Sequence, residues 1–239
     1  MEMLHNIFNK IYAFVLKGDR FHCPLCSNGF RKFLPAGVEQ RPNGLCPGCG
    51  SLERHRLLWI ALNKQWDCGQ FKQGGSMLHI APEKALTNKF IDFFDYFSAD
   101  LDGRKAMMAM DITAIGFPND SFDAIVCNHV LEHVPQDRKA LAELYRVLKP
   151  GGWGSIQVPM EGETTEEDPS VTDPAVRTRL YGQSDHIRRY GTDFVNRLKE
   201  AGFVVLALQK SELLGRYEQE RISVACENEV ILVRKPLLP

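Results

Sequence analysis

The sequence has no long hydrophobic run and almost no net charge, and each absence excludes a class of function. No stretch approaches the roughly 18 consecutive apolar residues that a membrane-spanning helix needs, so no membrane partner is expected. The formal net charge of −1 excludes a chain-wide electrostatic attraction to nucleic acid. With 239 residues, of which 44% are hydrophobic, the chain can bury one substantial core and support a small appendage.

A secretion signal is not apparent in the first residues either. Residues 1–20 have no basic start and no small-residue cleavage site, so we expect a reducing, cytoplasmic setting. Apolar residues recur there at helical spacing and predict an N-terminal helix over residues 1–17 that packs on a domain. These apolar positions are Leu4, Ile7, Phe8, Ile11, Tyr12 and Val15.

The small net charge hides an uneven distribution. Through residue 66 there are nine lysines and arginines against four acidic residues, a balance of +5, which leaves −6 for the remainder. A basic segment of this kind can contact phosphate, and a solvated basic face explains it equally well. RNA therefore stays an alternative partner.

Four of the seven cysteines form two Cys-x-x-Cys pairs. Cys23 and Cys26 are followed, after nineteen residues, by Cys46 and Cys49. Two such turns can bring four thiolates onto one tetrahedral ion, with Zn–S distances of about 2.3 Å. The spacing predicts a structural zinc ribbon over residues 18–50, and disulfide bonds are the alternative. After it, residues 51–74 read as a connecting helix, with Ser51 as its N-cap, and a linker.

The strongest functional signal is the stretch 122–158. An apolar strand over 122–127 precedes a helix over 136–148, a Lys-Pro-Gly-Gly turn and another strand from Trp153. Polar residues follow the first strand, at the edge where open α/β sheets bind ligands. The polar residues are Asn128, His129, Glu132 and His133. This arrangement predicts a site on a Rossmann-like scaffold.

The same stretch resembles the class I S-adenosylmethionine-dependent methyltransferases of the type 11 kind. The matching residues run from Asp111 through Ser121-Phe122-Asp123 and Val130–His133 to Arg146–Gly152. The resemblance covers about residues 75–235 and implies a domain over 75–239, with a mostly parallel sheet and an antiparallel last strand. It also implies S-adenosylmethionine as cofactor. The string from Cys46 to Arg56 resembles a subset of bacterial methyltransferases that carry an N-terminal ribbon.

The resemblance assigns cofactor-binding positions, but the first of them depart from the family pattern. The family has an acidic residue and then Gly-x-Gly-x-Gly after the first strand; here His79 replaces the acid, and Ala81, Glu83 and Ala85 replace the glycines. A glutamate does not adopt a positive φ comfortably. Either the loop follows another path, in which Glu83 meets the methionine ammonium, or the cofactor site is lost. The implied partners of the nucleoside are Asp100, Asp111 and Asn128.

The polar cluster leaves three interpretations open. His129, Glu132 and His133 share one face if a helix begins near Asn128. They could supply a general base, hold a second divalent metal or simply brace the helix. The spacing resembles the Glu-x-x-Glu-His metal motif of ubiquinone-pathway O-methyltransferases and small-RNA 2′-O-methyltransferases, and the RNA enzymes add a later histidine, for which His186 is the candidate.

We expect residues 159–191 to form a lid that contacts the methyl acceptor. The first half of this segment is acidic and is expected to be mobile. The Asn/Asp-Pro-Pro-Tyr string of amide and adenine N-methyltransferases is absent, which favours oxygen as the acceptor. A small hydroxylated metabolite is the leading substrate class, and RNA is second. The alternative function is a zinc-ribbon binding or scaffold protein with a catalytically inactive methyltransferase fold.

Overall fold

A computed structural model describes residues 12–37, 39–224 and 228–237, and contacts divide the chain into two compact units. The helix expected over residues 1–17 falls mostly on residues 1–11, outside the described residues. Each unit combines stretches that are far apart in sequence. Unit 1 comprises Met1–Lys72, Glu83–Asp92 and Leu208–Val230. Unit 2 comprises Gln73–Pro82, Phe93–Ala207 and Ile231–Pro239.

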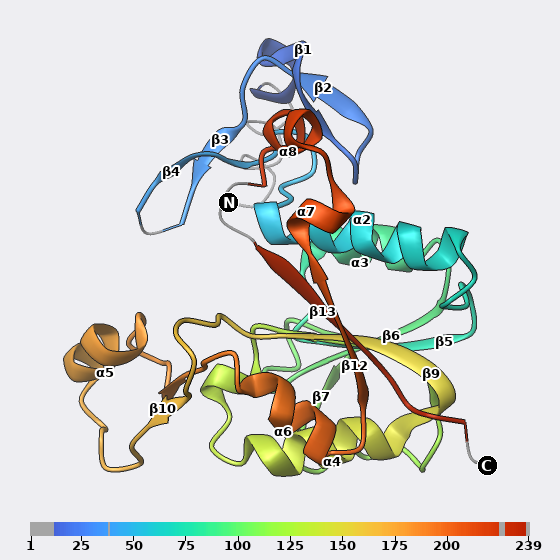
Figure 1. Ribbon diagram of the computed structural model, residues 1–239, viewed down its shortest axis with the longest axis vertical. Helices are drawn as coiled ribbons and strands as arrows, with labels where there is room; N and C mark the ends of the chain where they lie inside the picture. The colour runs from blue at the N-terminus through green and yellow to red at the C-terminus, as the bar shows by residue number, and fades with distance from the viewer. Residues whose placement is uncertain (1–11, 38, 225–227, 238–239) are drawn as a thin grey trace. The chain divides into compact units, whose positions relative to one another are not determined.

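The main sheet has seven strands in the order β12-β13-β9-β8-β5-β6-β7 (Figure 1). The pairs β5–β6, β5–β8, β6–β7 and β8–β9 are parallel, and β13 runs antiparallel to β9. This confirms the expected mostly parallel sheet with an antiparallel strand near its end. The strands are β5 Ser76–Ile80, β6 Asp95–Asp100, β7 Met108–Ala109, β8 Phe122–Asn128, β9 Leu148–Gln157, β12 Val204–Gln209 and β13 Glu229–Arg234.

Strand β8 and helix α4 (Asp137–Val147) show why the sequence forms this core. Every residue of β8 except Asp123 is buried, as its continuous apolar run predicts. Helix α4 turns its apolar residues, spaced three and four apart, into the core with α6 (Phe194–Glu200), and both helices cover one face of the sheet (Figure 1). The buried residues of α4 include Ala140, Leu141, Leu144 and Val147, each 0% exposed.

The Lys-Pro-Gly-Gly segment differs from the prediction. Helix α4 ends at Val147 and β9 already begins at Leu148, so the expected turn is wrong: these residues form the irregular first part of the strand. Gly151 has φ +78°, which a side chain would strain. At Gly152 an added Cβ would lie 3.0 Å from the Asp123 carbonyl oxygen, so only glycine fits.

Other residues of the family motif hold strand ends together. Asp123 Oδ2 accepts hydrogen bonds from Lys149 Nζ (2.7 Å), Ser76 N (2.9 Å) and Ser76 Oγ (3.0 Å), which ties the starts of β5, β8 and β9. The guanidinium of Arg146 donates to the carbonyl oxygens of Ile115 and Phe117, each at 2.8 Å. These parts of the motif are structural.

Among its described residues, unit 1 contains the ribbon, the helical residues 12–15 and the helices α2, α3, α7 and α8. Its buried hub is Arg56, which is 0% exposed and donates to the carbonyl oxygens of Ser51 (2.7 Å), Gly44 (3.1 Å) and Ile222 (2.8 Å). Arg56 therefore fixes the ribbon to a helix near the other end of the chain. The elements are β1 Lys17–Cys23, β2 Asn28–Phe30, β3 Leu34–Ala36, β4 Arg41–Leu45, α2 Glu53–Asp67, α3 Lys84–Phe90, α7 Lys210–Leu213 and α8 Arg216–Ile222.

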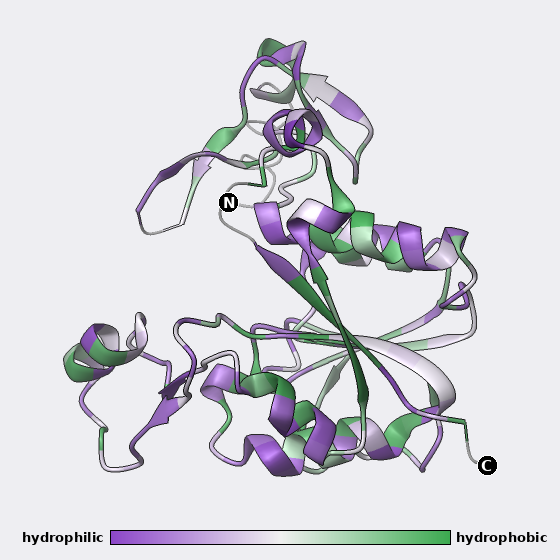
Figure 2. Ribbon diagram, in the orientation of Figure 1, coloured by the Kyte–Doolittle hydropathy of each residue, from purple (hydrophilic) through white to green (hydrophobic). Residues whose placement is uncertain are grey.

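The segment 159–191 in unit 2 contains short elements, and the mobility expected of its acidic half stays a prediction. It forms β10 (Glu166–Glu167), α5 (Pro174–Tyr181) and β11 (Arg188–Arg189), with β10 and β11 paired antiparallel. It is hydrophilic at β10, whereas β12 and β13 are mostly hydrophobic (Figure 2). The 3₁₀ turn η1 (Leu131–His133) follows β8. Across the described residues, no helix has the length and hydropathy to cross a membrane.

Candidate active site and zinc site

The carboxyl ends of β5, β6 and β8 lie side by side and define the candidate active site. Ile80 pairs with Ala99 on β6 and with Cys127 on β8. The residues that follow these positions, among them Ala81, Asp100 and Asn128, therefore meet at one edge of the parallel sheet. This is the edge at which such sheets bind ligands.

The loop after β5 follows a path that the sequence did not predict. Ala81 has φ +47°, the left-handed conformation, and its amide donates to the Ala99 carbonyl oxygen at 2.8 Å. Glu83 has φ −90° and is the N-cap of α3. The strain expected at Glu83 is thus absent, and the strained position is Ala81, where the family has a glycine.

His79 and Glu83 are both engaged by neighbouring side chains. His79 is 0% exposed and its Nδ1 lies 2.9 Å from the Tyr96 hydroxyl, so it supports the β5–β6 pair. Glu83 Oε1 accepts from Arg54 Nη2 at 3.0 Å and lies 2.6 Å from His55 Nε2. His55, which is surplus to a four-cysteine zinc shell, is thereby placed on a carboxylate.

The expected nucleoside carboxylates lie after β6 and β7, each in a local turn. Asp100 Oδ1 accepts from the Asp102 amide at 2.7 Å, and Asp111 Oδ1 accepts from the Thr113 amide at 2.8 Å. Hydrogen bonds from the Thr113 backbone and hydroxyl hold the pKa of Asp111 below its usual value, so this carboxylate is charged near neutral pH. Residues 101–107 between β6 and β7 contain turns and no helix.

The polar cluster is not a helical face, so that part of the prediction is wrong. His129 has φ +55° and its amide donates to the Gln157 carbonyl oxygen, continuing the edge of the sheet. Only Leu131–His133 form a turn, η1, of 3₁₀ type. His129 Nδ1 lies 3.6 Å from Glu132 Oε1 but stands outside the tighter group that Glu132 forms with two other histidines.

That group brings together Glu132, His133 and His186. Their potential ligand atoms all lie within 4.8 Å of one another, and the two imidazole rings are 4.8 Å apart, centre to centre. Glu132 is 2% exposed and its Oε2 has no hydrogen-bond partner among the described residues. His186 Nδ1 lies 3.0 Å from the Tyr181 carbonyl oxygen, and His133 Nδ1 lies 3.2 Å from that of Asp185. A carbonyl partner fixes the proton on Nδ1 and leaves each Nε2 free to accept a proton or bind a cation.

The segment 181–191 is held over the turn η1 by a buried ionic network. Arg188, 4% exposed, donates to the carbonyl oxygens of Leu131 (2.8 Å) and Pro135 (3.1 Å) and to Glu167 (2.7 Å). Asp137 Oδ2 accepts from Arg197 (2.6 Å) and from the Tyr190 hydroxyl (2.7 Å). Our sequence reasoning missed this network, although the adjacent arginines at 188–189 were a visible signal.

The four predicted zinc ligands converge in unit 1. Cys23 Sγ lies 3.6 Å from Cys49 Sγ, and Cys26 Sγ lies 3.8 Å from Cys46 Sγ. Four sulfurs arranged tetrahedrally at about 2.3 Å from zinc would lie about 3.8 Å apart, and sulfurs joined in a disulfide about 2 Å apart. The donor set therefore fits a structural zinc ion. The prediction that Ser51 is the N-cap of α2 is wrong, because Leu52 occupies that position. The Ser51 hydroxyl instead lies 3.2 Å from Cys23 Sγ.

Comparison with known proteins shows which family part of this chain resembles. Residues 45–156 match the family model described as a methyltransferase domain. A ubiquinone/menaquinone biosynthesis C-methyltransferase from Brucella canis is 28% identical over 144 residues, 54% of this chain and 49% of the relative. The protein from Brucella anthropi is 26% identical over 144 residues. The chain thus spans about half the length of the curated relatives it matches.

Solved structures agree on the fold at low sequence identity. The [4+2]-cyclase SpnF has a TM-score of 0.52 at 16% identity, covering 79% of this chain and 84% of that one. Phosphoethanolamine N-methyltransferase 2 of Haemonchus contortus, solved with S-adenosylmethionine, has a TM-score of 0.52 at 16% identity, covering 76% and 52%. Residues 45–156 thus resemble a methyltransferase domain, and the strand order is that of the class I methyltransferase fold.

Proposed function

We propose that the chain transfers a methyl group from S-adenosylmethionine to a hydroxyl oxygen of a small molecule. The observation that carries the acceptor chemistry is the group of Glu132, His133 and His186, in which a buried carboxylate oxygen lacks a partner and two imidazoles keep Nε2 free. Methyl transfer is an in-line displacement at the sulfonium carbon, so it needs alignment and removal of the acceptor proton. An imidazole Nε2 can take that proton.

The cofactor would be bound at the sheet edge described above. Asp100 and Asp111 would take the ribose hydroxyls and the adenine amine, and Asn128 closes the same edge from β8. The left-handed backbone at Ala81 supports a close approach of the loop to the ligand, as a glycine does in the family. Because Glu83 is bonded to Arg54 and His55, we do not assign it to the methionine ammonium.

A divalent cation on Glu132, His133 and His186 is the second form of this proposal. Two imidazoles and one carboxylate are a common ligand set, and the carbonyl partners of both Nδ1 atoms orient the rings for it. Such an ion would lower the pKa of the acceptor hydroxyl. The chain's own residues would still orient the acceptor and exclude water, with the segment 181–191 above them.

Calorimetry with S-adenosylhomocysteine tests the cofactor part. Saturable binding that is weakened at least tenfold by Asp100→Ala is the expected result. No heat and no thermal shift at millimolar ligand would favour the alternative, a zinc-ribbon binding protein with an inactive fold. The cyclase among the structural neighbours shows why the fold does not settle the reaction.

Chelation separates the two chemical forms. If a cation is used, a chelator abolishes methyl transfer and leaves S-adenosylhomocysteine affinity unchanged. If a histidine is a metal-free base, turnover resists the chelator. His186→Ala should lower the rate at least a hundredfold, with His22→Ala as a control outside the cluster. A rate within a few-fold of the parent for His133→Ala/His186→Ala would refute both forms.

Analysis of the methylated product decides the acceptor. Radiolabel from S-adenosylmethionine should enter low-molecular-weight material of a cell extract and be released as an O-methyl group. Label confined to RNase-sensitive material would instead support the RNA alternative. A C-methyl product would match the activity that the names of the Brucella relatives describe.

A further inference from the structure

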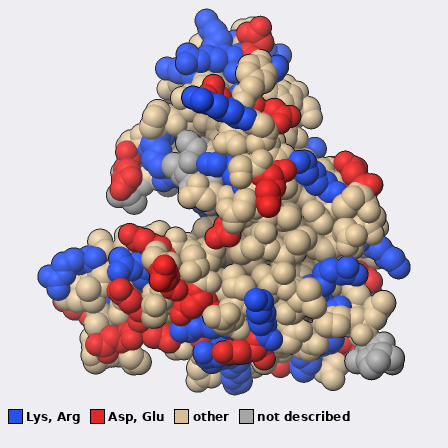
Figure 3. Space-filling model, in the orientation of Figure 1, with Lys and Arg blue, Asp and Glu red and all other residues tan. Residues whose placement is uncertain are grey.

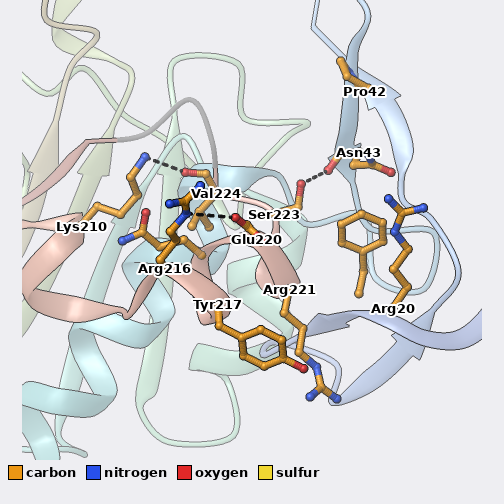
Figure 4. A pocket seen from close by; sticks show the side chains of 12 residues that line it. Arg20, Pro42, Asn43, Lys210, Arg216, Tyr217, Glu220, Arg221, Ser223 and Val224 are labelled. Atoms are coloured by element: carbon orange, nitrogen blue, oxygen red, sulfur yellow. Dashed lines mark hydrogen bonds and ion pairs between the residues drawn. The ribbon is translucent and has the colours of Figure 1, made fainter.

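Unit 1 contains a pocket of about 660 Å³ that the methyltransferase reaction does not explain (Figure 4). It lies between α8 and α7 on one side and strands β1 and β4 on the other. Its volume falls within the 300–1,000 Å³ typical of small-molecule sites. None of its lining residues belongs to the polar cluster of unit 2.

The lining is strongly basic and carries an exposed aromatic ring. Arg20, Lys210, Arg216 and Arg221 line it, against the single carboxylate of Glu220. Glu220 lies 3.4 Å from Arg216, while Arg20 and Arg221 have no ion-pair partner among the described residues. Lysine and arginine side chains also gather on the surface over β1 and α8 (Figure 3). The excess of cations calls for an anionic ligand.

Tyr217 adds the aromatic component. Its side chain is 70% exposed, it is the second residue of α8, and it points to the same side of the helix as Arg221 (Figure 4). An exposed aromatic ring beside guanidinium groups is the combination that binds a base by stacking and its phosphate by charge-assisted hydrogen bonds. A purely anionic ligand would leave the ring unused.

The walls of the pocket are fixed by the buried Arg56. Its Nη2 donates to the carbonyl oxygen of Ser223, and its Nη1 to that of Gly44. The Ser223 hydroxyl donates to the Asn43 carbonyl oxygen at 2.9 Å, which joins α8 directly to β4. Both Asn43 (φ +59°) and Ser223 (φ +54°) have left-handed backbones. Both residues line the pocket, so these two left-handed turns help to set its shape.

We infer that this pocket binds a nucleoside phosphate, with the phosphate on Arg20 and Arg221 and the base against Tyr217. The ligand is either a free nucleotide or a nucleotide within a single-stranded RNA. Both sources present the same chemistry to the pocket. The site adds to the proposed function and does not depend on it, since binding can be measured without methyl transfer.

Equilibrium binding to the full-length, zinc-loaded chain tests the site. Saturating S-adenosylhomocysteine is added so that the cofactor site cannot take the probes, which are UDP, ADP, uridine, inorganic phosphate and a uridine hexanucleotide. At least one nucleotide probe should bind tenfold more tightly than uridine and than inorganic phosphate. If neither diphosphate nor the hexanucleotide binds, or if inorganic phosphate binds as tightly as they do, the inference is overturned.

Matched variants locate the binding. Arg221→Glu should weaken it at least tenfold, and Lys32→Glu, an exposed cation of the same unit outside the pocket, should change it less than twofold. Tyr217→Ala should weaken it about tenfold, and Tyr217→Phe should restore it because stacking needs only the ring. Unchanged zinc content and melting temperature show that Arg221→Glu is folded. An equal loss from Lys32→Glu would mean diffuse attraction and would refute the pocket.

The hexanucleotide distinguishes the two sources. Tighter binding than UDP, with a steeper loss of affinity as salt rises, identifies RNA, since each further phosphate contact releases counterions. Binding equal to or weaker than that of UDP identifies a free nucleotide. Either result supports the site, provided that Arg221→Glu abolishes it.

Discussion

At the scale of single residues, the departure from the glycine-rich loop is resolved at Ala81 and not at Glu83. Pro82 fixes its own φ and lets Glu83 enter α3 at φ −90°, so the glutamate is unstrained. Ala81 instead adopts the left-handed conformation, with φ +47°. Its methyl side chain makes this conformation cost about 1–2 kcal/mol. Alanine has no branched or bulky side chain that would add to this cost.

Ala81→Gly and Ala85→Gly should therefore have opposite effects on stability. Glycine at 81 removes the strain but adds chain entropy to the unfolded state, so we expect the protein to gain about 0.5 kcal/mol. At 85, a helical residue of α3 that is 6% exposed, the same change should cost about 1–2 kcal/mol. Urea midpoints measure both. Equal losses at the two positions would contradict a left-handed Ala81.

The polar cluster shows what the sequence could predict and what it could not. Residue type and spacing made Glu132 and His133 candidates, and the family resemblance added His186. The fold brings their potential ligand atoms within 4.8 Å of one another. The helical face that was to include His129 was wrong because His129 N–H bonds to β9, which holds the chain in the sheet edge for one more residue. Such a contact depends on the neighbouring strand, which local periodicity does not reveal.

At the scale of elements, the antiparallel pair β10–β11 carries a buried arginine, Arg188, next to a partly exposed one, Arg189. Arg188 lies in the network with Asp137 and Glu167, with its side chain 5% exposed. Arg189 pairs with Glu166 at 2.8 Å and its side chain is 33% exposed. Neighbours along a strand point to opposite sides, so the two arginines are a natural matched pair.

Arg188→Ala should destabilise the segment strongly, whereas Arg189→Ala should hardly affect it. Loss of the buried guanidinium leaves several carbonyl oxygens and Glu167 without a donor, and we expect a loss of about 3 kcal/mol. The exposed pair of Arg189 is worth at most about 1 kcal/mol. Hydrogen exchange over 159–191 and urea denaturation measure the two. Similar protection from hydrogen exchange in both variants would show that the buried Arg188 network does not stabilise the segment.

The pairing of β10 with β11 should weaken on acidification. Burial raises the pKa of Glu167, but hydrogen bonds from Arg197 and Arg188 outweigh it, so the pKa lies below the ordinary value of about 4.3. A lowered folded pKa gives stability that is complete above about pH 4.3 and lost as the pH falls through the folded pKa. Limited proteolysis within 159–191 should rise in that acidic range. Glu167→Gln should show the same cleavage at neutral and acidic pH, and a wild-type rate independent of pH would contradict the mechanism.

At the scale of the whole molecule, each unit is assembled from stretches that are distant in sequence, and this assembly could not be predicted from the sequence. The contiguous boundaries drawn from composition separate residues 18–50 from 51–74, whereas the structure joins both to α3 and to residues 208–230. The mostly parallel sheet was implied by the family resemblance, and the cysteine quartet was predictable from its spacing. The docking of α8 on the ribbon rests on Arg56, a residue that reads locally as an ordinary charged position of a helix.

Zinc should therefore stabilise α8 as well as the ribbon. Ser51 lies beside Cys23 Sγ, its carbonyl oxygen binds Arg56, and Arg56 binds the carbonyl oxygens of Ile222 and Ser223. Cys46→Ser should lower the zinc content from about one equivalent and open both regions, because structural zinc sites couple metal binding to folding. Elemental analysis and hydrogen exchange at residues 18–50 and 216–224 measure this.

Cys68→Ser is the control, since Cys68 is exposed and outside the cysteine cluster. It should retain zinc and the protection of both regions. Retention of zinc by a variant with all four ligands replaced would refute the site. If Cys46→Ser opens the ribbon while α8 keeps its protection, then Arg56 does not transmit the loss, and the nucleotide pocket that α8 lines would be independent of the metal.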